Sequence, residues 1–90
     1  MLTKKEKEIV IRCAKRYQVS SVFLFGSSIA RRNGHDIDLG VRGIKPKLFF
    51  KLYADLFRYL PRPVDLIDLD SESNYFTKRI IAGGKVIYEA

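Results

Sequence analysis

A strongly amphipathic segment between two short apolar segments limits the folds open to this chain. Pro46 is well placed at the start of a helix, and apolar side chains then recur at helical spacing as far as residue 60. The segments on either side, residues 36–41 and 64–69, are typical of strands. A helix that connects two strands suggests a right-handed crossover between parallel neighbours. We therefore expect these two segments to pair in parallel within one sheet.

The remaining segments predict an alternation of helices and strands along the chain. Helices are expected at residues 3–17, 27–32 and from Asp70 or Ser71 to Gly83, and strands at residues 22–25 and 86–88. Thr3 and Glu6 have the spacing of a capping box, and Asp70 or Ser71 would cap the last helix. Neither a repeat nor a linker divides the chain. The expected fold is α/β (α+β): one domain over residues 1–90, with a small mixed sheet of about four strands packed with helices.

Two acids one residue apart open the second predicted strand. Residues i and i+2 of a strand point to the same face, so Asp36 and Asp38 project side by side while Ile37 and Leu39 point the other way. Two adjacent carboxylates repel each other unless something positive lies between them. Because Mg²⁺ prefers oxygen ligands, the pair predicts a site for a hard divalent cation.

A Gly-Ser turn, Gly26-Ser27-Ser28, follows the first predicted strand. Glycine lets the backbone approach a ligand closely. If a helix starts at Ser27 or Ser28, its free N–H groups favour a phosphate in front of it, although Ser27 could also be a simple N-cap. Phosphate-binding amides opposite metal-binding carboxylates are the layout that phosphoryl or nucleotidyl transfer needs.

The parallel pairing indicates which later acid joins the first two. If the two strands are parallel, their first residues share one edge of the sheet, and Asp65 lies near Asp36. Asp68 lies roughly 10 Å further along the strand and points to the opposite face. The first strand must run antiparallel to the second so that its Gly-Ser end reaches the same edge. Asp65 is therefore predicted to be the third carboxylate.

These residues resemble the nucleotidyltransferase superfamily that includes DNA polymerase beta, and in particular its minimal (MNT) branch of small stand-alone domains. That branch carries Gly-Ser, a spacer, Asp-x-Asp and a third Asp on a later strand, here Gly26-Ser27, Asp36-Ile37-Asp38 and Asp65 within Val-Asp-Leu-Ile. The similarity covers nearly the whole chain and implies a polymerase-beta-like nucleotidyltransferase fold. The spacer between Ser27 and Asp36 is shorter than is usual in the branch. An Arg usually follows Gly-Ser; Arg31 is the favoured counterpart and Arg32 the alternative.

The resemblance implies a two-metal mechanism of nucleotidyl transfer. Asp36 and Asp38 would bind both of two Mg²⁺ ions about 3.5–4 Å apart, and Asp65 would bind the ion that activates the acceptor hydroxyl. The reaction implied is transfer of NMP, in the first place AMP from ATP, to a hydroxyl with release of pyrophosphate. Arg31 would neutralise charge in the transition state. The nucleotide-binding residues implied are Gly26, Ser27, Ser28 and Arg31.

Small stand-alone domains of this kind resemble the antitoxin member of toxin–antitoxin pairs with a HEPN-domain ribonuclease toxin. The resemblance implies a protein adenylyltransferase that neutralises its partner by adenylylating a tyrosine or by binding it. Polymerase-type enzymes grip acceptor and base with additional domains, which a chain of 90 residues does not supply. A HEPN partner or self-association could complete the pocket.

Two other functions stay open from the sequence. The shortened spacer favours a catalytically inactive antitoxin that acts as a binding module. A formal charge of +7 and a pI near 9.8 would suit a basic nucleic-acid-binding protein. The cations are scattered rather than gathered into one run, so much of the excess is expected on solvated helix faces. Only Arg31, Arg32 and Arg42 are expected near the site.

The other noteworthy residues have simpler structural interpretations. His35 lies beside the acids and could touch phosphate, but a lone histidine in a turn more often faces solvent. The aromatic residues of 49–59 are at helical spacing and are expected mostly in the core, with a partner surface at Tyr53 or Tyr59 as the lesser option. Cys13 lies on the apolar stripe of the first helix and is expected to be a small buried hydrophobe.

Membrane association and export are not expected. No apolar stretch approaches the roughly 20 residues of a membrane span, and the N-terminus lacks the apolar core of a signal peptide. The single cysteine cannot form an internal disulfide. These features predict a cytoplasmic protein.

Overall fold

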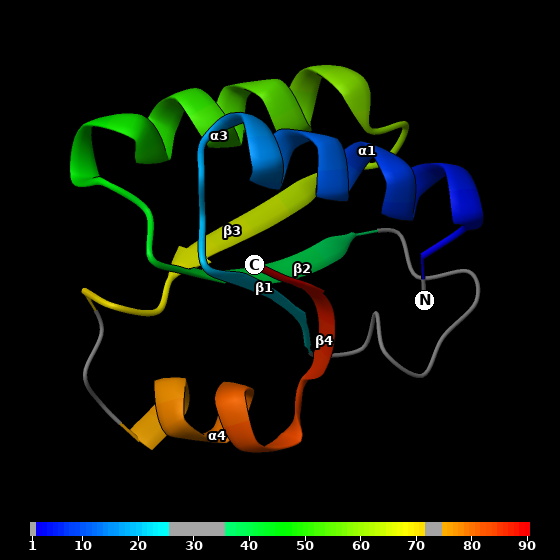
Figure 1. The fold of residues 1–90 in the computed structure, drawn as a ribbon. Helices are drawn as coiled ribbons and strands as arrows, with labels where there is room; N and C mark the ends of the chain where they lie inside the picture. The colour runs from blue at the N-terminus through cyan, green and yellow to red at the C-terminus, as the bar shows by residue number, and fades with distance from the viewer. Residues whose placement is uncertain (1, 26–35, 72–74) are drawn as a thin grey trace.

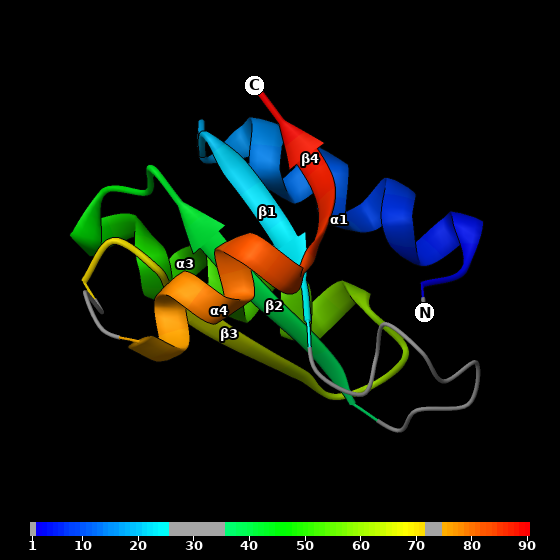
Figure 2. The same cartoon turned by 90° about the horizontal axis from the view of Figure 1, so that it is seen from below.

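A mixed sheet forms the centre of the molecule, with helices on both faces. The computed structural model describes residues 2–25, 36–71 and 75–90. The strands β1 (Ser21–Leu24), β2 (Ile37–Arg42), β3 (Val64–Asp68) and β4 (Lys85–Glu89) form one four-stranded sheet in the order β3-β2-β1-β4. α1 (Lys4–Arg16) and α3 (Pro46–Tyr59) cover one face, and α4 (Tyr75–Gly83) covers the other (Figure 1 and Figure 2). None of these described helices is both long and apolar enough to cross a membrane.

The strand directions agree with the sequence-based prediction. β2 and β3 are parallel, as expected from the helix α3 between them, and β1 is antiparallel to both β2 and β4. The mixed sheet and the α+β class are therefore confirmed. The predicted helix at residues 27–32 lies outside the described residues.

α1 begins where the sequence predicts, because Thr3 and Glu6 form a capping box. The Glu6 N–H donates to Thr3 Oγ1 at 3.1 Å, and the Thr3 N–H donates to Glu6 Oε1 at 2.9 Å. The inner face of the helix buries Val10, Cys13 and Ala14. Cys13 is a small buried hydrophobe, as predicted.

Two apolar layers of unequal size hold the sheet between the helices. Every second residue of β2 from Ile37 to Val41 is fully buried in the layer beneath α1 and α3. Among the described residues that layer contains 16 buried side chains, whereas the layer on the α4 side contains only Phe23, Leu69 and Ile80. The side chains of β2 that point away from α1 and α3 therefore meet a thinner layer.

The segment after β3 differs from the sequence-based prediction. Asp70 and Ser71 do not cap the last helix, because α4 begins at Tyr75. The Asp70 carboxylate instead accepts a hydrogen bond from the Gly43 N–H and lies 3.7 Å from Arg42 Nε. These contacts join the turn after β3 to the end of β2.

The prediction that the aromatic residues of 49–59 lie mostly in the core is wrong for three of them. Phe50, Phe57 and Tyr59 are 77%, 66% and 51% exposed. Phe49 and Tyr53 are partly buried and pack against the larger layer. α3 therefore packs on the sheet through one face and carries exposed aromatic side chains outside that face.

Candidate functional site

Three segments of the predicted motif converge in one row across the sheet. Asp38 on β2 and Asp65 on β3 are register partners in the parallel pair. On the other side of β2, the Phe25 N–H donates to the Asp38 carbonyl oxygen at 3.0 Å. Phe25 directly precedes Gly26, so the chain enters the Gly-Ser motif beside the two acids.

Asp38 and Asp65 lie on the face of the sheet opposite α1 and α3. Their strand neighbours Ile37 and Val64 are buried in the α1–α3 layer, and successive side chains of a strand point to opposite faces. Asp65 is exposed and Asp38 is half-buried. Asp36, one residue before β2, is also exposed. The acids are therefore accessible to a ligand from the thinner side of the sheet.

The strand register differs in one detail from the prediction. Asp65 lies opposite Asp38 rather than Asp36, because β2 and β3 start in register. Asp68 pairs with Val41 instead, near the far end of both strands. Since Asp68 is an odd number of residues from Asp65, its side chain is on the opposite face, as predicted.

The ionisation of Asp38 depends on its burial and on the two acids near it. Burial raises the pKa of Asp38, and the negative charges of Asp65 and Asp36 raise it further. A cation between these carboxylates would relieve the repulsion. All the available donors are hard oxygens, which suits Mg²⁺.

The acids do not complete a metal site by themselves in the described part of the chain. Within residues 2–25, 36–71 and 75–90, no group of three acidic, His or Cys side chains is arranged to hold a metal ion. Mg²⁺ is often bound by one or two carboxylates together with substrate phosphates. The pair Asp38 and Asp65, with Asp36 beside it, fits such a shared site.

The phosphate-binding half of the predicted site lies outside the described residues. This holds for Gly26, Ser27, Ser28, Arg31, Arg32 and His35. Their proposed roles therefore rest on the sequence motif, and on the position of Phe25, the last described residue before it.

Arg42 is not near the acids, contrary to the sequence-based prediction. It ends β2, about 13 Å along the strand from Asp38 at a rise of ~3.3 Å per residue. Arg42 Nε lies 3.7 Å from the Asp70 carboxylate. Its charge therefore serves the turn after β3 rather than a nucleotide at the acids.

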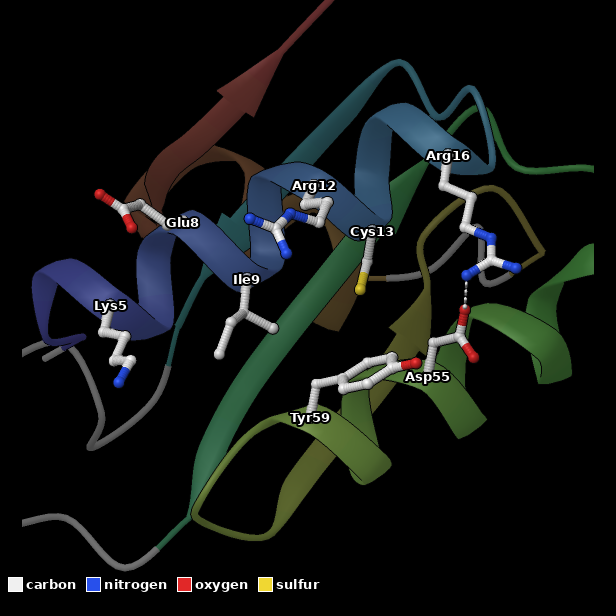
Figure 3. A pocket seen from close by; sticks show the side chains of 8 residues that line it. All are labelled: Lys5, Glu8, Ile9, Arg12, Cys13, Arg16, Asp55 and Tyr59. Atoms are coloured by element: carbon white, nitrogen blue, oxygen red, sulfur yellow. Dashed lines mark ion pairs between the residues drawn. The ribbon is translucent and has the colours of Figure 1, made fainter.

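A groove of about 440 Å³ lies between α1 and α3 (Figure 3). Arg16 and Asp55 form an ion pair across it at 3.5 Å, and the Tyr17 hydroxyl donates to the same carboxylate at 2.6 Å. The groove is in the helical layer on the other side of the sheet from Asp38 and Asp65. It is therefore separate from the candidate site.

Solved structures of toxin–antitoxin complexes share this fold. A chain in the complex of tri-AMPylated Shewanella oneidensis HEPN toxin with MNT antitoxin is 21% identical, with a TM-score of 0.75, over 99% of this chain and 74% of that chain. A chain in the MntA–HepT complex is 22% identical, with a TM-score of 0.74, over 98% and 74% of the two chains. A chain in a toxin–antitoxin complex with AMP-PNP is 25% identical, with a TM-score of 0.73, over 93% and 73%.

The sequence also matches a family profile over almost its whole length. The profile is "Polymerase beta, Nucleotidyltransferase", and the match extends over residues 7–90. Among curated proteins, none matches significantly. The family match agrees with the mixed sheet and with the row of acids at the start of β2 and β3. The chain belongs to the polymerase beta nucleotidyltransferase family.

Proposed function

We propose that this chain is a Mg²⁺-dependent adenylyltransferase that transfers AMP from ATP to a hydroxyl of a partner protein. The observation that carries the proposal is the register pairing of Asp38 with Asp65, next to the strand end that leads into Gly26-Ser27. Membership of the nucleotidyltransferase family supports the reaction type.

The transfer step exchanges one bond at phosphorus. The acceptor oxygen forms a bond to the α-phosphorus of ATP, and the bond from that phosphorus to the oxygen bridging to the β-phosphate breaks. Pyrophosphate leaves with the electron pair, and the hydroxyl proton passes to the Asp65 carboxylate. Asp65 suits this role because it is exposed and lies on an edge strand, where a bulky acceptor can approach it.

Asp36, Asp38 and Asp65 are the residues that would hold Mg²⁺. Burial raises the pKa of Asp38, and the negative charges of Asp65 and Asp36 raise it further, so a cation beside Asp38 would be favoured. When bound, Mg²⁺ would offset phosphate charge and favour ionisation of the acceptor hydroxyl. Gly26, Ser27, Ser28 and Arg31 are the proposed phosphate-binding residues.

The proposed partner is a HEPN-domain toxin, and the proposed acceptor is a tyrosine hydroxyl. Support comes from two of the similar structures: one holds a tri-AMPylated HEPN toxin with an MNT antitoxin, and another holds AMP-PNP. In this proposal the chain is an antitoxin that acts by modification. The reaction would take place in the cytoplasm, where ATP is abundant.

A transfer assay with a matched control tests the proposal. The chain is incubated with ATP labelled at the α-phosphate, Mg²⁺ and a HEPN-domain toxin, and labelled toxin is measured. Asp38→Asn and Asp65→Asn should each reduce transfer by about a hundredfold or more, since even changes behind a metal ligand cost about 10–100-fold. Asp68→Asn, on the same strand as Asp65 but on the other face, should retain transfer. Equal turnover by Asp38→Asn and the wild type would refute the assignment.

A catalytically inactive binding module is the second candidate. It is favoured by the shortened spacer between Ser27 and Asp36. Under this alternative the chain would bind the toxin tightly and protect its targets without labelling it. Unlabelled toxin in a stable complex, at saturating ATP and Mg²⁺, would decide for this candidate.

A further inference from the structure

The outer edge of the sheet beside Asp65 has main-chain groups without strand partners. β3 is an edge strand, since β2 is its only neighbour among the described strands. The Ile37 N–H donates to Pro63 O at 2.8 Å, and the Leu69 N–H donates to Val41 O at 2.9 Å. In a parallel pair the bonding residues of a strand alternate, so the main chains of Val64, Leu66 and Asp68 point outward.

Side chains cap only part of this edge. The Tyr53 hydroxyl donates to Val64 O at 3.0 Å, and the Ser71 hydroxyl donates to Asp68 O at 3.2 Å. The structure gives no partner among the described residues to the outward N–H groups or to Leu66 O. An extended segment placed alongside β3 would supply the missing acceptors and donor.

An aromatic stripe on α3 follows the same edge. Phe50, Tyr53 and Phe57 recur at helical spacing on the side of α3 that overhangs β3, where Tyr53 reaches Val64. Phe50 also lines a groove of about 400 Å³ together with Leu66 and other residues of β3. The exposures of Phe50 and Phe57, 77% and 66%, mark an apolar surface that is open in this chain.

Three cations flank the aromatic stripe. Lys47, Lys51 and Arg58 lie on the exposed surface of α3, and none of them has an ion pair among the described residues. Two copies of this chain joined through β3 would bring these cations of both α3 helices together, and each chain carries a charge of +7. Charge therefore favours a partner with acidic side chains over a second copy.

We propose that the edge of β3 binds an extended segment of the protein substrate as an added strand and so presents the acceptor hydroxyl to Asp65. Apolar side chains of the segment would contact Phe50 and Phe57. An added strand lies about 4.8 Å from β3, and its residue opposite Asp65 projects to the same face as Asp65. This inference rests on the proposed adenylyl transfer and names how the acceptor is held.

Binding of tyrosine-centred peptides tests the docking without the chemistry. The probe is a set of fluorescent peptides with central tyrosine, in which the other positions vary among Asp, Glu, Leu, Val and Phe; ATP and Mg²⁺ are omitted. The Phe50→Ser/Phe57→Ser double variant should weaken binding of the best peptide by about tenfold or more. Tyr59→Ser is the matched control. Tyr59 is an exposed aromatic residue of the same helix, but it lines the α1–α3 groove. The Tyr59→Ser variant should therefore bind the peptide normally.

Backbone methylation separates an added strand from contact through side chains alone. Methylating the alternate nitrogens of the peptide that face β3 should weaken binding by about tenfold, whereas methylating the other set should not. The inference would be overturned if both methylation sets weakened binding equally. It would also be overturned if Tyr59→Ser weakened binding as much as the double variant, or if no peptide bound at all. A dimer of this chain that the Phe50→Ser/Phe57→Ser variant dissociates would overturn it as well.

The two proposals fail in different ways. The Asp38→Asn chain should bind the best peptide like the wild type, because Asp38 is not on the edge strand. Normal binding without any transfer would therefore contradict the reaction and leave the docking intact. Transfer to a toxin that is unchanged in the Phe50→Ser/Phe57→Ser variant would contradict the docking and leave the reaction intact.

Discussion

Arg62 binds Glu6 through two nitrogens of its guanidinium group. Nε lies 2.8 Å from Oε2, Nη2 lies 2.8 Å from Oε1, and the Glu6 side chain is only 4% exposed. Arg62 lies just before β3, and Glu6 lies in the first turn of α1. The pair therefore links α1 to the start of β3, the strand that contains Asp65.

Removing Arg62 should destabilise the fold strongly. Arg62→Ala leaves a buried carboxylate without its partner, and we expect the free energy of unfolding to fall by about 3 kcal/mol or more. Urea denaturation measures the change. A Glu6→Leu/Arg62→Met double variant should lose less free energy of unfolding than Arg62→Ala, because it leaves no unpaired charge. A loss of under about 1 kcal/mol for Arg62→Ala would show that the pair is energetically neutral.

The same pair should make stability depend on acidity. Burial alone would raise the pKa of Glu6, but the hydrogen bonds from Arg62 and Thr3 outweigh burial and hold the pKa below its usual 4.5. A carboxyl with a lowered folded-state pKa contributes stability above 4.5, and that contribution is lost as the pH falls from there through the folded-state pKa. As the pH is lowered from about 6 to about 3, the melting temperature should therefore fall less for Glu6→Gln than for the wild type. Equal losses would contradict this role of Glu6.

Asp38→Asn should stabilise the chain while removing transfer. The pKa of Asp38 is raised by burial and by Asp65 and Asp36, so its ionised form is disfavoured in the folded state at neutral pH. A group of this kind costs stability above its folded-state pKa, and the cost disappears as the pH falls below it. We expect the neutral amide to raise the free energy of unfolding by about 0.5 kcal/mol in EDTA at pH 7. A lower melting temperature for the variant would contradict repulsion at this site.

Mg²⁺ and nucleotide should stabilise the wild type together. A ligand at about 100 times its dissociation constant adds about 2.7 kcal/mol to the free energy of unfolding. We expect a rise in melting temperature with Mg²⁺ and AMP-PNP that EDTA reverses and that is smaller in Asp65→Asn. If phosphate oxygens complete the coordination, as proposed, Mg²⁺ alone should have a weaker effect. The same rise in EDTA would argue against a metal.

Gly43→Ala should destabilise the fold without touching the site. Gly43 has a φ of +75°, and an added Cβ would collide with the side chain and backbone nitrogen of Ser20. We expect a cost of about 1–3 kcal/mol in urea denaturation. Gly83→Ala is the control, since an added Cβ there meets nothing within 4 Å. Comparable losses for both variants would mean that the conformation of Gly43 is not what matters.

Local sequence patterns were sufficient to predict the framework of the fold. The capping box at Thr3 and Glu6, the amphipathic period of α3 and the alternation in β2 each depend on near neighbours. The parallel pairing of β2 and β3 follows from the crossover between them, and it places Asp65 in the row of Asp38.

Properties set by distant parts of the chain were not predictable in the same way. Asp65 faces Asp38 rather than Asp36, a strand register that local sequence patterns do not specify. The sequence shows that Phe50 is aromatic but not that its side of α3 overhangs an edge strand with no further layer on it among the described residues. Burial of such a residue depends on what covers it, which helical period alone does not reveal.

The unequal layers of the sheet imply unequal resistance to local melting. α4 rests on a small cluster around Phe23, Leu69 and Ile80, so its amides should exchange with deuterium faster than those of α1. Asp38 and Asp65 face the same side of the sheet as α4. Substrates could then enter and leave through small displacements of one short helix, while the opposite half of the domain stays rigid and keeps the strands in register.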